Sequence, residues 1–258
     1  MSLGPTPYAE VNAVLRRLLT GVQAVLGKHF IGLYLYGSLA SGDFQLGRSD
    51  IDFVVVTNDV LPAALLPALE ALHSRLAASE LAWATRLEGA YLPRDVLRRH
   101  DPEGSSYPCF NEGRFRLERL GPDWVIQRHI LREHSVVVAG PDPRPWIDPV
   151  TPDDLRRAVR ETLQGWWAPM LTNPAWLDRV DYRSFAVLTM CRGLYALEYG
   201  AIVSKTAAAQ WARGTLGERW SALIDRALAW QYGMPFDALS DTLALIEYVV
   251  ARSQPGDR

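Results

Sequence analysis

Two short stretches of the sequence carry residue types that bind phosphate and metal ions. Gly37-Ser38 follows an apolar run at residues 31–36, and Asp50 and Asp52 lie at the start of a second run, residues 51–57. Both runs are rich in β-branched and aromatic residues, which predicts strands. Because side chains alternate along a strand, Asp50 and Asp52 point to one face, with Cα atoms about 6.5–7 Å apart. The pattern predicts a glycine turn that binds a triphosphate beside two carboxylates that bind Mg²⁺.

The residues that follow Asp52 favour a metal site over a simple strand start. An isolated Asp-x-Asp is more often a solvated loop or strand start than a metal site. Residues 53–56 read Phe-Val-Val-Val, so Asp52 lies one residue inside an apolar run. Burying an unpaired carboxylate there costs several kcal/mol. A bound cation would offset that cost.

A third carboxylate is expected on a neighbouring strand. The segment 81–92 is apolar and roughly alternating, and Glu88 is its only interior acid. A hydroxyl that attacks an α-phosphate must lose its proton, and a carboxylate within hydrogen-bond reach accepts it. Glu88 is therefore the candidate general base. From this segment alone, a glutamate facing water on an edge strand is an equally good interpretation.

Together these residues resemble the signature of the polymerase-β-like nucleotidyltransferase superfamily. That signature combines a Gly-Ser turn, an acidic pair and a later strand carboxylate, here Gly37-Ser38, Asp50, Asp52 and Glu88. The resemblance implies that all three acids are catalytic and that Asp50 and Asp52 bind the metal. It fixes the reaction as transfer of a nucleoside monophosphate to a hydroxyl, and it leaves the acceptor open.

A larger part of the chain is similar to the aminoglycoside adenylyltransferases, which act on streptomycin and spectinomycin at the 3'' or 9 hydroxyl. The similarity runs from about Gly32 to Tyr232. One group of residues resembles the junction between the family's domains, and a second resembles its central C-terminal helix and the following turn. The groups are Arg132-Glu133-His134-Ser135-Val136, Gly140-Pro141 and Asp148-Pro149-Val150, and then residues 187–192, Gly200, Lys205 and Trp211.

This resemblance implies that ATP is the co-substrate and that two Mg²⁺ ions are the cofactor. It also implies three nucleotide-binding residues in the second half. Matching positions in the family contact the nucleotide phosphates at Arg192 and Lys205, and Tyr232 stands near a position that lines the cleft. Without the resemblance, an arginine or lysine on a helix is usually a solvated side chain.

Aromatic and acidic residues in the second half are the candidates for binding the acceptor. Relatives that modify streptomycin carry a tryptophan near Trp166 and Trp167, although packing explains two adjacent indoles equally well. Asp178 and Asp181 are expected in a loop before the Arg192 helix, where acids bind amines or guanidinium groups of a drug. A pair of acids at a helix N-terminus is an equally good interpretation.

Two departures from the family's pattern bear on the acceptor. Relatives that take streptomycin carry Pro-Asp-Trp where this chain has Pro174-Ala175-Trp176, so a carboxylate suited to a guanidinium is missing. The segment 103–126, where the family has a substrate-facing tryptophan, aligns poorly, and Trp124 and Phe115 are both candidates for that place. Spectinomycin is therefore favoured over streptomycin.

The prolines divide the sequence into an α/β half and an all-α half. Five prolines fall between residues 139 and 153, at positions 141, 143, 145, 149 and 152. Before them, alternating strand and helix patterns predict a nucleotidyltransferase domain, a mixed sheet with helices, at residues 1–148. After them, Thr151-Pro152-Asp153-Asp154 opens a series of helical periods. These predict a C-terminal helical bundle, the adenylyltransferase-associated domain, at residues 149–258.

Composition limits the possible partners. The 258 residues include 27 basic and 29 acidic ones, for a net charge of −2, without the basic field of a nonspecific nucleic-acid binder. Cys109 and Cys191 have neither metal-ligand nor disulfide-scaffold spacing. No leader pattern and no long apolar stretch is present in the sequence. We expect a cytoplasmic monomer whose partners are ATP and a small cationic antibiotic, with no membrane and no extended nucleic acid.

The sequence as a whole predicts Mg²⁺-dependent transfer of AMP from ATP to a hydroxyl of an aminoglycoside or aminocyclitol antibiotic, with release of pyrophosphate. Two alternatives stay open. One is a nucleotidyltransferase that acts on another small molecule, a protein or an RNA. The other is a noncatalytic nucleotide-binding sensor, which would retain the Gly-Ser turn but would not need both aspartates and a base.

Overall fold

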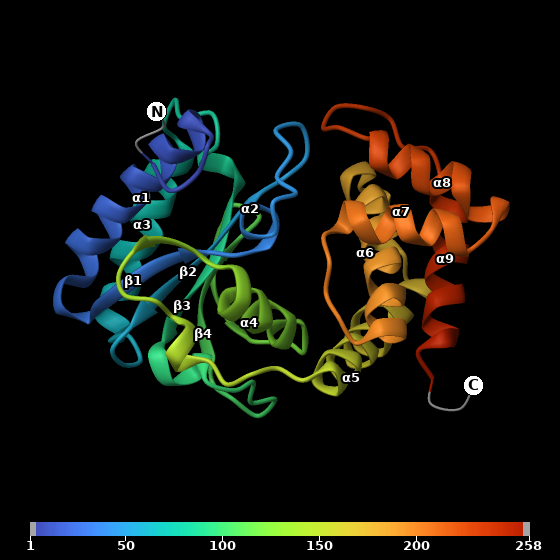
Figure 1. Ribbon diagram of the computed structural model, residues 1–258. Coiled ribbons are helices and arrows are strands. Elements are labelled where there is room, and N and C mark those ends of the chain that lie inside the picture. Colours follow the sequence, from blue (N-terminus) through green and yellow to red (C-terminus); the bar gives the residue numbers. More distant parts are fainter. Residues whose placement is uncertain (1–3, 255–258) are drawn as a thin grey trace. The chain divides into compact units, whose positions relative to one another are not determined.

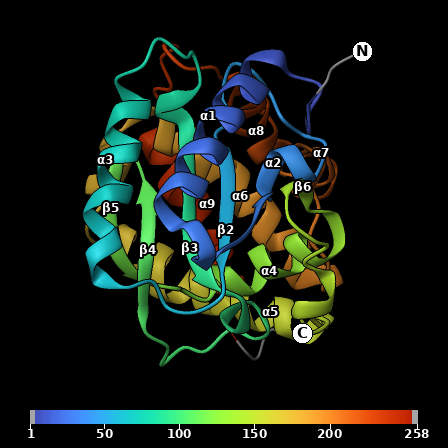
Figure 2. The same ribbon diagram turned by 90° about the vertical axis from the view of Figure 1, so that its left-hand side faces the viewer.

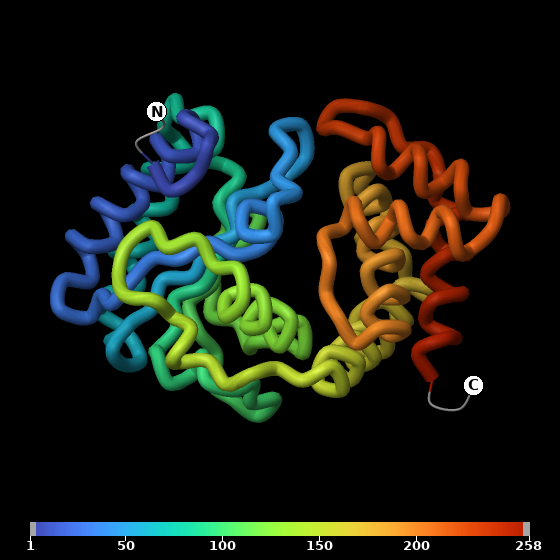
Figure 3. The backbone as a smooth tube through the Cα atoms, in the orientation of Figure 1, coloured from blue at the N-terminus to red at the C-terminus, as the bar shows by residue number. Residues whose placement is uncertain are grey.

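The computed structural model describes residues 4–254 and divides the chain into two compact units. The first unit holds the chain up to Phe44 and then Ser49–Pro149. The second unit holds Gln45–Arg48 and the chain from Val150 onward. The sequence led us to expect one crossing, after residue 148. The additional excursion falls in the loop that follows helix α2 (Gly37–Ala40), which Figure 3 traces.

A six-stranded mixed sheet forms the centre of the first unit. Its order is β5-β4-β3-β2-β1-β6. Strands β2 and β3 pair in parallel, and the other neighbours are antiparallel. The strands are β1 (Phe30–Leu35), β2 (Ile51–Thr57), β3 (Leu87–Pro93), β4 (Ser106–Asn111), β5 (Arg114–Arg119) and β6 (Val136–Ala139). The expected mixed sheet with helices is confirmed.

Helices cover both faces of this sheet. Figures 1 and 2 show α1 and α3 on one face and α4 on the other. Apolar side chains of α1 and α3 pack against Leu33, Phe53 and Val55 in one core. Because side chains alternate, Tyr34, Asp52 and Val54 face α4 instead. The helices are α1 (Ala9–Leu26), α2 (Gly37–Ala40), α3 (Leu66–Ala77) and α4 (Asp123–His134).

The strand that carries Glu88 is shorter than the sequence pattern indicates. Residues 81–86 form turns, and β3 begins at Leu87. The cause is Trp83, which is buried beside Phe44 with ring centroids 5.2 Å apart. Its indole N–H donates to the Glu10 carboxylate at 3.3 Å. This tertiary packing overrides the alternating apolar pattern.

Sequence reasoning missed the hairpin formed by β4 and β5. Its turn is the pair Glu112-Gly113, and both residues have positive φ, 49° and 72°. Two positive φ values are typical of the tight turn whose twist matches a two-residue hairpin. A glycine between two short polar-apolar runs was the available signal.

The second unit is a bundle of helices packed around α6. Helix α6 contacts α5, α7, α8 and α9. Two expected ends are confirmed, because Thr151 and Asp154 form a capping box and Gly200 ends α6 at a φ of 61°. The helices are α5 (Pro152–Thr162), α6 (Val180–Tyr199), α7 (Lys205–Thr215), α8 (Glu218–Ala229) and α9 (Leu239–Arg252). Of the helices within residues 4–254, none combines the length and apolarity needed to cross a membrane.

The excursion Gln45–Arg48 is bonded to the helices of the second unit. Arg48 donates from Nη1 to the carbonyl of Leu228 at 2.8 Å and from Nη2 to the Thr206 hydroxyl at 3.0 Å. The Gly47 carbonyl accepts from the backbone N–H of Tyr232 at 3.0 Å. Arg48 therefore satisfies carbonyl groups at the C-terminal end of α8, where a cation is favourable.

A buried histidine lies in the core of the first unit. His73 on α3 is 1% exposed and stacks on Phe110 with centroids 4.0 Å apart. Its Nε2 lies 2.8 Å from the Tyr91 hydroxyl, and its Nδ1 has no hydrogen-bond partner. Burial lowers the pKa of His73 to about 4.

This depressed pKa makes folding stability depend on pH. An unfolded histidine has a pKa of about 6.5, so between pH 6.5 and 4 the unfolded chain binds the extra proton. Stability is therefore lost as the pH falls through this range, by at most about 3 kcal/mol. We expect the His73→Phe variant, which keeps the stack, to lose less. Urea unfolding at several pH values measures this, and equal losses in both proteins would contradict it.

Candidate active site

Three neighbouring strands bring Tyr36, Asp52 and Glu88 into one row. Leu35 pairs with Phe53 across β1 and β2, and the next N–H, that of Tyr36, donates to the Asp52 carbonyl at 3.1 Å. On the other side, Asp52 is the direct partner of Glu88 in the parallel β2–β3 pair. Partners on adjacent strands lie about 4.8 Å apart and point to the same face. The two carboxylates that were expected on neighbouring strands are therefore adjacent.

The glycine turn lies directly against one of these carboxylates. Gly37 has a φ of +61°, and a Cβ added to it would lie 1.8 Å from Oδ2 of Asp52. Only glycine meets both conditions without strain. Ser38 follows in the single turn of α2, which is closed by a bond from the Ser41 N–H to the Gly37 carbonyl at 3.0 Å. The predicted phosphate turn and the predicted metal ligand Asp52 are thus in contact.

Asp50 lies immediately before β2 and is paired with an arginine. Its Oδ1 is 3.6 Å from Nη1 of Arg86, and both side chains are about one-third exposed. Arg86 ends the turn that precedes β3, two residues before Glu88. Sequence reasoning did not select Arg86. The available signal was its position two residues before the candidate base Glu88. A metal ion at Asp50 would have to compete with this guanidinium.

Three acids lie near the buried phenol of Tyr36. Burial raises the pKa of Tyr36, and the charges of Asp52, Glu88 and Asp123 raise it further. Asp123 begins α4, and the next residue, Trp124, packs its ring 6.0 Å from that of Tyr36. Asp123 is an acid that sequence reasoning missed. Its only sequence signal is its position at a helix start after Gly121-Pro122.

The acids present fit a magnesium ion that is shared with a nucleotide. Within residues 4–254, no group of three or more histidine, cysteine or acidic side chains is close enough to hold a metal ion by itself. Mg²⁺ is usually bound by one or two carboxylates together with substrate phosphates, rather than by a complete protein cage. Asp52 beside the Gly37 turn, with Asp50 two residues earlier, offers hard oxygen donors of that kind.

The two tryptophans predicted for the acceptor belong to an aromatic surface of the second unit. Trp167 is buried, with 2% exposed, while Trp166 is 45% exposed. The indole N–H of Trp166 donates to the Tyr182 hydroxyl at 2.9 Å. Further ring contacts complete the surface, which consists of Trp166, Trp167, Trp176, Tyr182 and Phe185. Packing therefore explains Trp167, which lies inside, while acceptor binding by the exposed Trp166 stays a prediction.

The two acids predicted for the acceptor do not share a loop. Asp178 ends a 3₁₀ turn and is exposed, whereas Asp181 lies in the first turn of α6. Arg179 donates to Asp181 at 2.7 Å. Burial opposes ionisation of Asp181, but the bonds and charge of Arg179 outweigh it and lower its pKa. Asp181 therefore fits the interpretation as a helix N-terminal acid, with a cation already at its side.

The three predicted nucleotide-binding residues of the second unit lie on different elements. Arg192 is half-buried on α6. Lys205 begins α7, and its Nζ lies 4.1 Å from the centroid of Phe185. Tyr232 is 38% exposed and packs against Trp230 with centroids 5.1 Å apart. Their contact with a nucleotide stays a prediction.

The two candidates for the family's substrate-facing tryptophan lie on opposite faces of the sheet. Trp124 contacts Tyr36 on the face covered by α4. Phe115 packs against His73, whose ring centroid is 6.0 Å away, on the α3 face. Of these two residues, Trp124 is therefore the one beside the carboxylate row.

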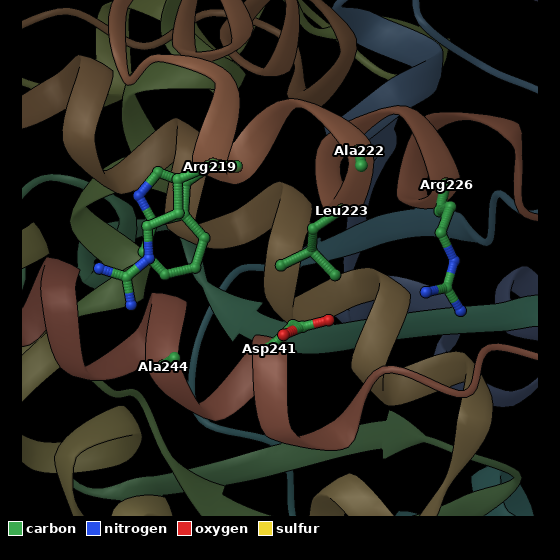
Figure 4. A pocket seen from close by; sticks show the side chains of 7 residues that line it. Arg219, Ala222, Leu223, Arg226, Asp241 and Ala244 are labelled. Atoms are coloured by element: carbon green, nitrogen blue, oxygen red, sulfur yellow. The ribbon is translucent and has the colours of Figure 1, made fainter.

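A shallow hollow in the second unit contains none of the predicted site residues. It lies between α8 and α9, and Figure 4 shows Arg219, Leu223, Arg226 and Asp241 around it. Arg219 lies over the Trp220 ring at 4.5 Å, and Arg226 donates to the Asp237 carbonyl at 2.9 Å. These arginines are engaged by packing and backbone groups, so we assign the hollow no role.

Two family models match the chain, one in its first half and one in its second half. Residues 15–98 match the family model of the nucleotidyltransferase domain, and residues 146–254 match that of the aminoglycoside adenylyltransferase C-terminal domain. The first match contains Gly37, Asp52 and Glu88. The second contains every predicted site residue of the second unit.

Individual relatives are similar along most of the chain. An aminoglycoside (3'') (9) adenylyltransferase of Escherichia coli is 28% identical and covers 94% of this chain and 93% of its own. A spectinomycin 9-adenylyltransferase of Staphylococcus aureus is 26% identical, covering 80% and 79%. The crystal structure of spectinomycin adenyltransferase AAD(9) from Enterococcus faecialis, with ATP and spectinomycin, has a TM-score of 0.76. It is 17% identical and covers 93% of this chain and 98% of its own, which shows a shared fold.

The contact between Gly37 and Asp52 predicts a specific cost for a side chain at residue 37. Gly37→Ala should lose about 1–2 kcal/mol of stability from its positive φ and about 10²-fold of activity, because the displaced Asp52 carboxylate misplaces the reacting groups. Gly42 is a matched control, since its φ is +72° and nothing lies within 4 Å of its missing Cβ. Gly42→Ala should lose stability alone. Urea unfolding and pyrophosphate release measure the two effects, and equal activities would contradict the prediction.

Proposed function

The chain belongs to the aminoglycoside adenylyltransferase family, and on that premise we propose that it transfers AMP from ATP to a hydroxyl of an aminoglycoside or aminocyclitol antibiotic. Pyrophosphate is the second product. The row in which Asp52 lies between the glycine turn and Glu88 is the observation that carries this proposal. Gly37 touches Asp52, and Asp52 pairs with Glu88, which supports these residues as phosphate-binding turn, metal ligand and base.

In this proposal, Asp50 and Asp52 hold Mg²⁺ together with the triphosphate. The ion supplies charge neutralisation to the phosphate oxygens and makes the α-phosphorus more susceptible to attack. The backbone of the Gly37-Ser38 turn holds the triphosphate, since its left-handed first residue exposes peptide N–H groups to an anion. With a cation at Asp50, the Arg86 guanidinium, whose Nη1 lies 3.6 Å from Oδ1 of Asp50, would be available to a phosphate oxygen.

Glu88 performs the proton transfer. The acceptor oxygen attacks the α-phosphorus, and its proton passes to the Glu88 carboxylate. The bond from the α-phosphorus to the bridging oxygen breaks, and the electron pair leaves with pyrophosphate. Arg192 and Lys205 are proposed to bind the nucleotide, because matching family positions contact its phosphates. Tyr232 is proposed to bind it too, because it stands near a family position that lines the cleft. The positive charges of the first two favour departure of the pyrophosphate anion.

Spectinomycin is the proposed acceptor in preference to streptomycin. Ala175 stands where streptomycin-modifying relatives carry an aspartate, so one carboxylate partner for a guanidinium is missing. The exposed part of the aromatic surface, with Trp166 and Trp176, offers apolar faces to a fused-ring aminocyclitol. Trp166, Asp178 and Asp181 remain the proposed acceptor-binding residues. Trp167 supports this surface from inside.

A panel of aminoglycosides and aminocyclitols tests the acceptor class. Each compound is incubated with the protein, ATP and Mg²⁺, and its mass is measured. A gain of one AMP on spectinomycin, together with equimolar pyrophosphate, is the expected result. Pyrophosphate release without any modified drug would point to another acceptor, and no release at all would leave a nucleotide-binding sensor.

Replacing Asp52 by asparagine should remove most of the activity. The amide retains the shape of the carboxylate but lacks the charge that holds the metal, so we expect turnover to fall at least ~10³-fold. Asp59→Asn is the control, because Asp59 is exposed beyond the end of β2 and contributes its carbonyl to Thr57. Near-normal turnover by Asp52→Asn would remove Asp52 from the site.

Replacing Glu88 by glutamine separates proton transfer from binding. Loss of a general base lowers kcat by about 10²–10⁴-fold, while Mg²⁺·ATP binding should change little. Glu80→Gln, an exposed glutamate before the same strand, should behave like the wild type. Steady-state kinetics and calorimetric nucleotide binding test this. An unchanged kcat in Glu88→Gln would show that another group accepts the proton.

A further inference from the structure

The six-stranded sheet of the first unit ends in two different edge strands, β5 and β6 (Figure 2). Strand β6 has four residues, and its register with β1 is irregular, which is one way in which proteins protect a sheet edge. Strand β5 has six residues and pairs with β4 in an unbroken register. Among residues 4–254, no strand pairs with the other side of β5. It is therefore the edge that a further strand can join.

The hairpin turn determines which backbone groups of β5 face the open edge. The two-residue turn Glu112-Gly113 joins Asn111 to Arg114, so this first pair exchanges backbone hydrogen bonds across the hairpin. Hydrogen-bonded and non-hydrogen-bonded pairs then alternate, so residues 114, 116 and 118 direct their N–H and C=O groups to β4. Residues 115, 117 and 119 direct theirs to the open edge. Three residues of β5 thus present donors and acceptors to a further strand.

The side chains of β5 place opposite charges on either side of an exposed leucine. Leu117 is 57% exposed. Arg116 and Glu118 share one face of the strand, where Nε of Arg116 lies 3.2 Å from Oε1 of Glu118, and both side chains are more than one-third exposed. Phe115 lies on the other face, where its ring packs against that of His73 on α3 with centroids 6.0 Å apart. This order of charges is complementary to an identical strand in antiparallel orientation.

One register of two antiparallel β5 strands keeps like charges apart. If Leu117 lies opposite Leu117 of the second copy, Arg116 lies opposite Glu118 of the second copy, and Glu118 lies opposite its Arg116. The neighbouring registers that keep the faces aligned are centred on Arg116 or on Glu118, and they place two arginines or two glutamates directly opposite each other, which is destabilising. In the Leu117-centred register, residues 115, 117 and 119 form the hydrogen-bonded pairs, as their outward N–H groups require. Charge and backbone geometry therefore agree on this register.

The same register brings Phe115 opposite Arg119 of the second copy at both ends of the contact. Arg119 is exposed, and it shares the face of β5 that carries Phe115. A guanidinium over an aromatic ring contributes a cation–π interaction. A hollow of about 320 Å³ lies beside Phe115, and Glu70 and Ser74 of α3 are among its lining residues. They offer a carboxylate and a hydroxyl to the incoming arginine.

We propose that the chain associates with a second copy of itself by antiparallel pairing of the two β5 strands around Leu117. The two six-stranded sheets then form one continuous sheet across a two-fold axis, and each favourable pair of side chains occurs twice. The sequence led us to expect a monomer, and sequence reasoning missed the hairpin whose edge forms this contact. The association does not depend on the proposed function.

Sedimentation equilibrium of the full chain over a series of concentrations tests the association. The contact of one strand pair is small, so we expect a reversible dimer, of twice the monomer mass of 28.8 kDa, that dissociates on dilution. Leu117→Pro should abolish the dimer, because proline lacks the N–H that residue 117 directs to the open edge. The hairpin does not use that N–H, so the variant should fold, which circular dichroism and the melting temperature check.

Charge reversal on β5 tests the register without a change in the backbone. Glu118→Arg places two pairs of arginines opposite each other, so the dissociation constant of the dimer should rise at least about 10-fold. The double variant with Arg116→Glu and Glu118→Arg restores opposite charges in both pairs and should return within about 2-fold of the wild type. Glu103→Arg is the matched control, because it makes the same change at an exposed glutamate outside β5. It should leave the association unchanged.

Each outcome supports or overturns the β5 contact. A wild-type protein that stays monomeric up to about 100 µM would overturn it. A dimer that is as strong in Leu117→Pro and Glu118→Arg as in the wild type would also overturn it, because the copies would then meet through another surface. Loss of the dimer in Glu118→Arg and its return in the double variant would support both the contact and its register.

Discussion

The close approach of the Gly37 backbone to the Asp52 carboxylate is the constraint around which the site is built. A side chain at residue 37 would occupy the space of Oδ2, since a Cβ there would lie 1.8 Å from it. The same glycine adopts a positive φ to start α2 immediately after β1. One residue without a side chain therefore sets two things, the direction of the turn and its distance from the acid on β2.

The strand register extends this constraint to the rest of the row. Because β1 and β2 are antiparallel and β2 and β3 are parallel, a single level across three strands carries Tyr36, Asp52 and Glu88. The opposite faces of these strands are packed by α1 and α3. A shift of one residue in register would bury the acids in that core, which burial costs forbid. The hydrophobic core therefore fixes the chemistry on the face that α4 covers.

Sequence patterns predicted those features of the site that depend on the periodicity of a single strand. Period-two alternation predicted Asp50 and Asp52 on one strand face, and apolar composition predicted Glu88 on a strand. The register makes Asp52 and Glu88 partners, whereas Asp50 lies immediately before β2. Alternation could not reveal that Asp50 meets Arg86 at 3.6 Å, because that pair joins two elements separated by α3. It could not predict Asp123 or Tyr36 either, because the docking of α4 brings Asp123 to the row and the pairing of β1 with β2 brings Tyr36 there.

For the fold as well, features that depend on neighbouring residues were predicted, and features that depend on residues distant in the sequence were not. Caps such as Thr151 with Asp154, and Gly200 at the end of α6, depend on neighbouring residues and were predicted. The apolar pattern of residues 81–92 indicated an earlier start for β3 than Leu87. That prediction was wrong because the buried Trp83 packs on residues distant in sequence. Asp181 was expected in a loop and instead lies within a helix beside Arg179, since α6 begins earlier than its apolar period indicates.

Because the second unit includes Gln45–Arg48, a single cut in the chain cannot separate the two units. The chain passes between them three times, after Phe44, after Arg48 and after Pro149. A fragment that begins at Val150 would lack the guanidinium that Arg48 supplies to the Leu228 carbonyl and the Thr206 hydroxyl. In a chimaera of two relatives, exchanging the C-terminal part alone would join one parent's tetrapeptide to the other parent's helices. Recombination that respects this fold must carry both segments together.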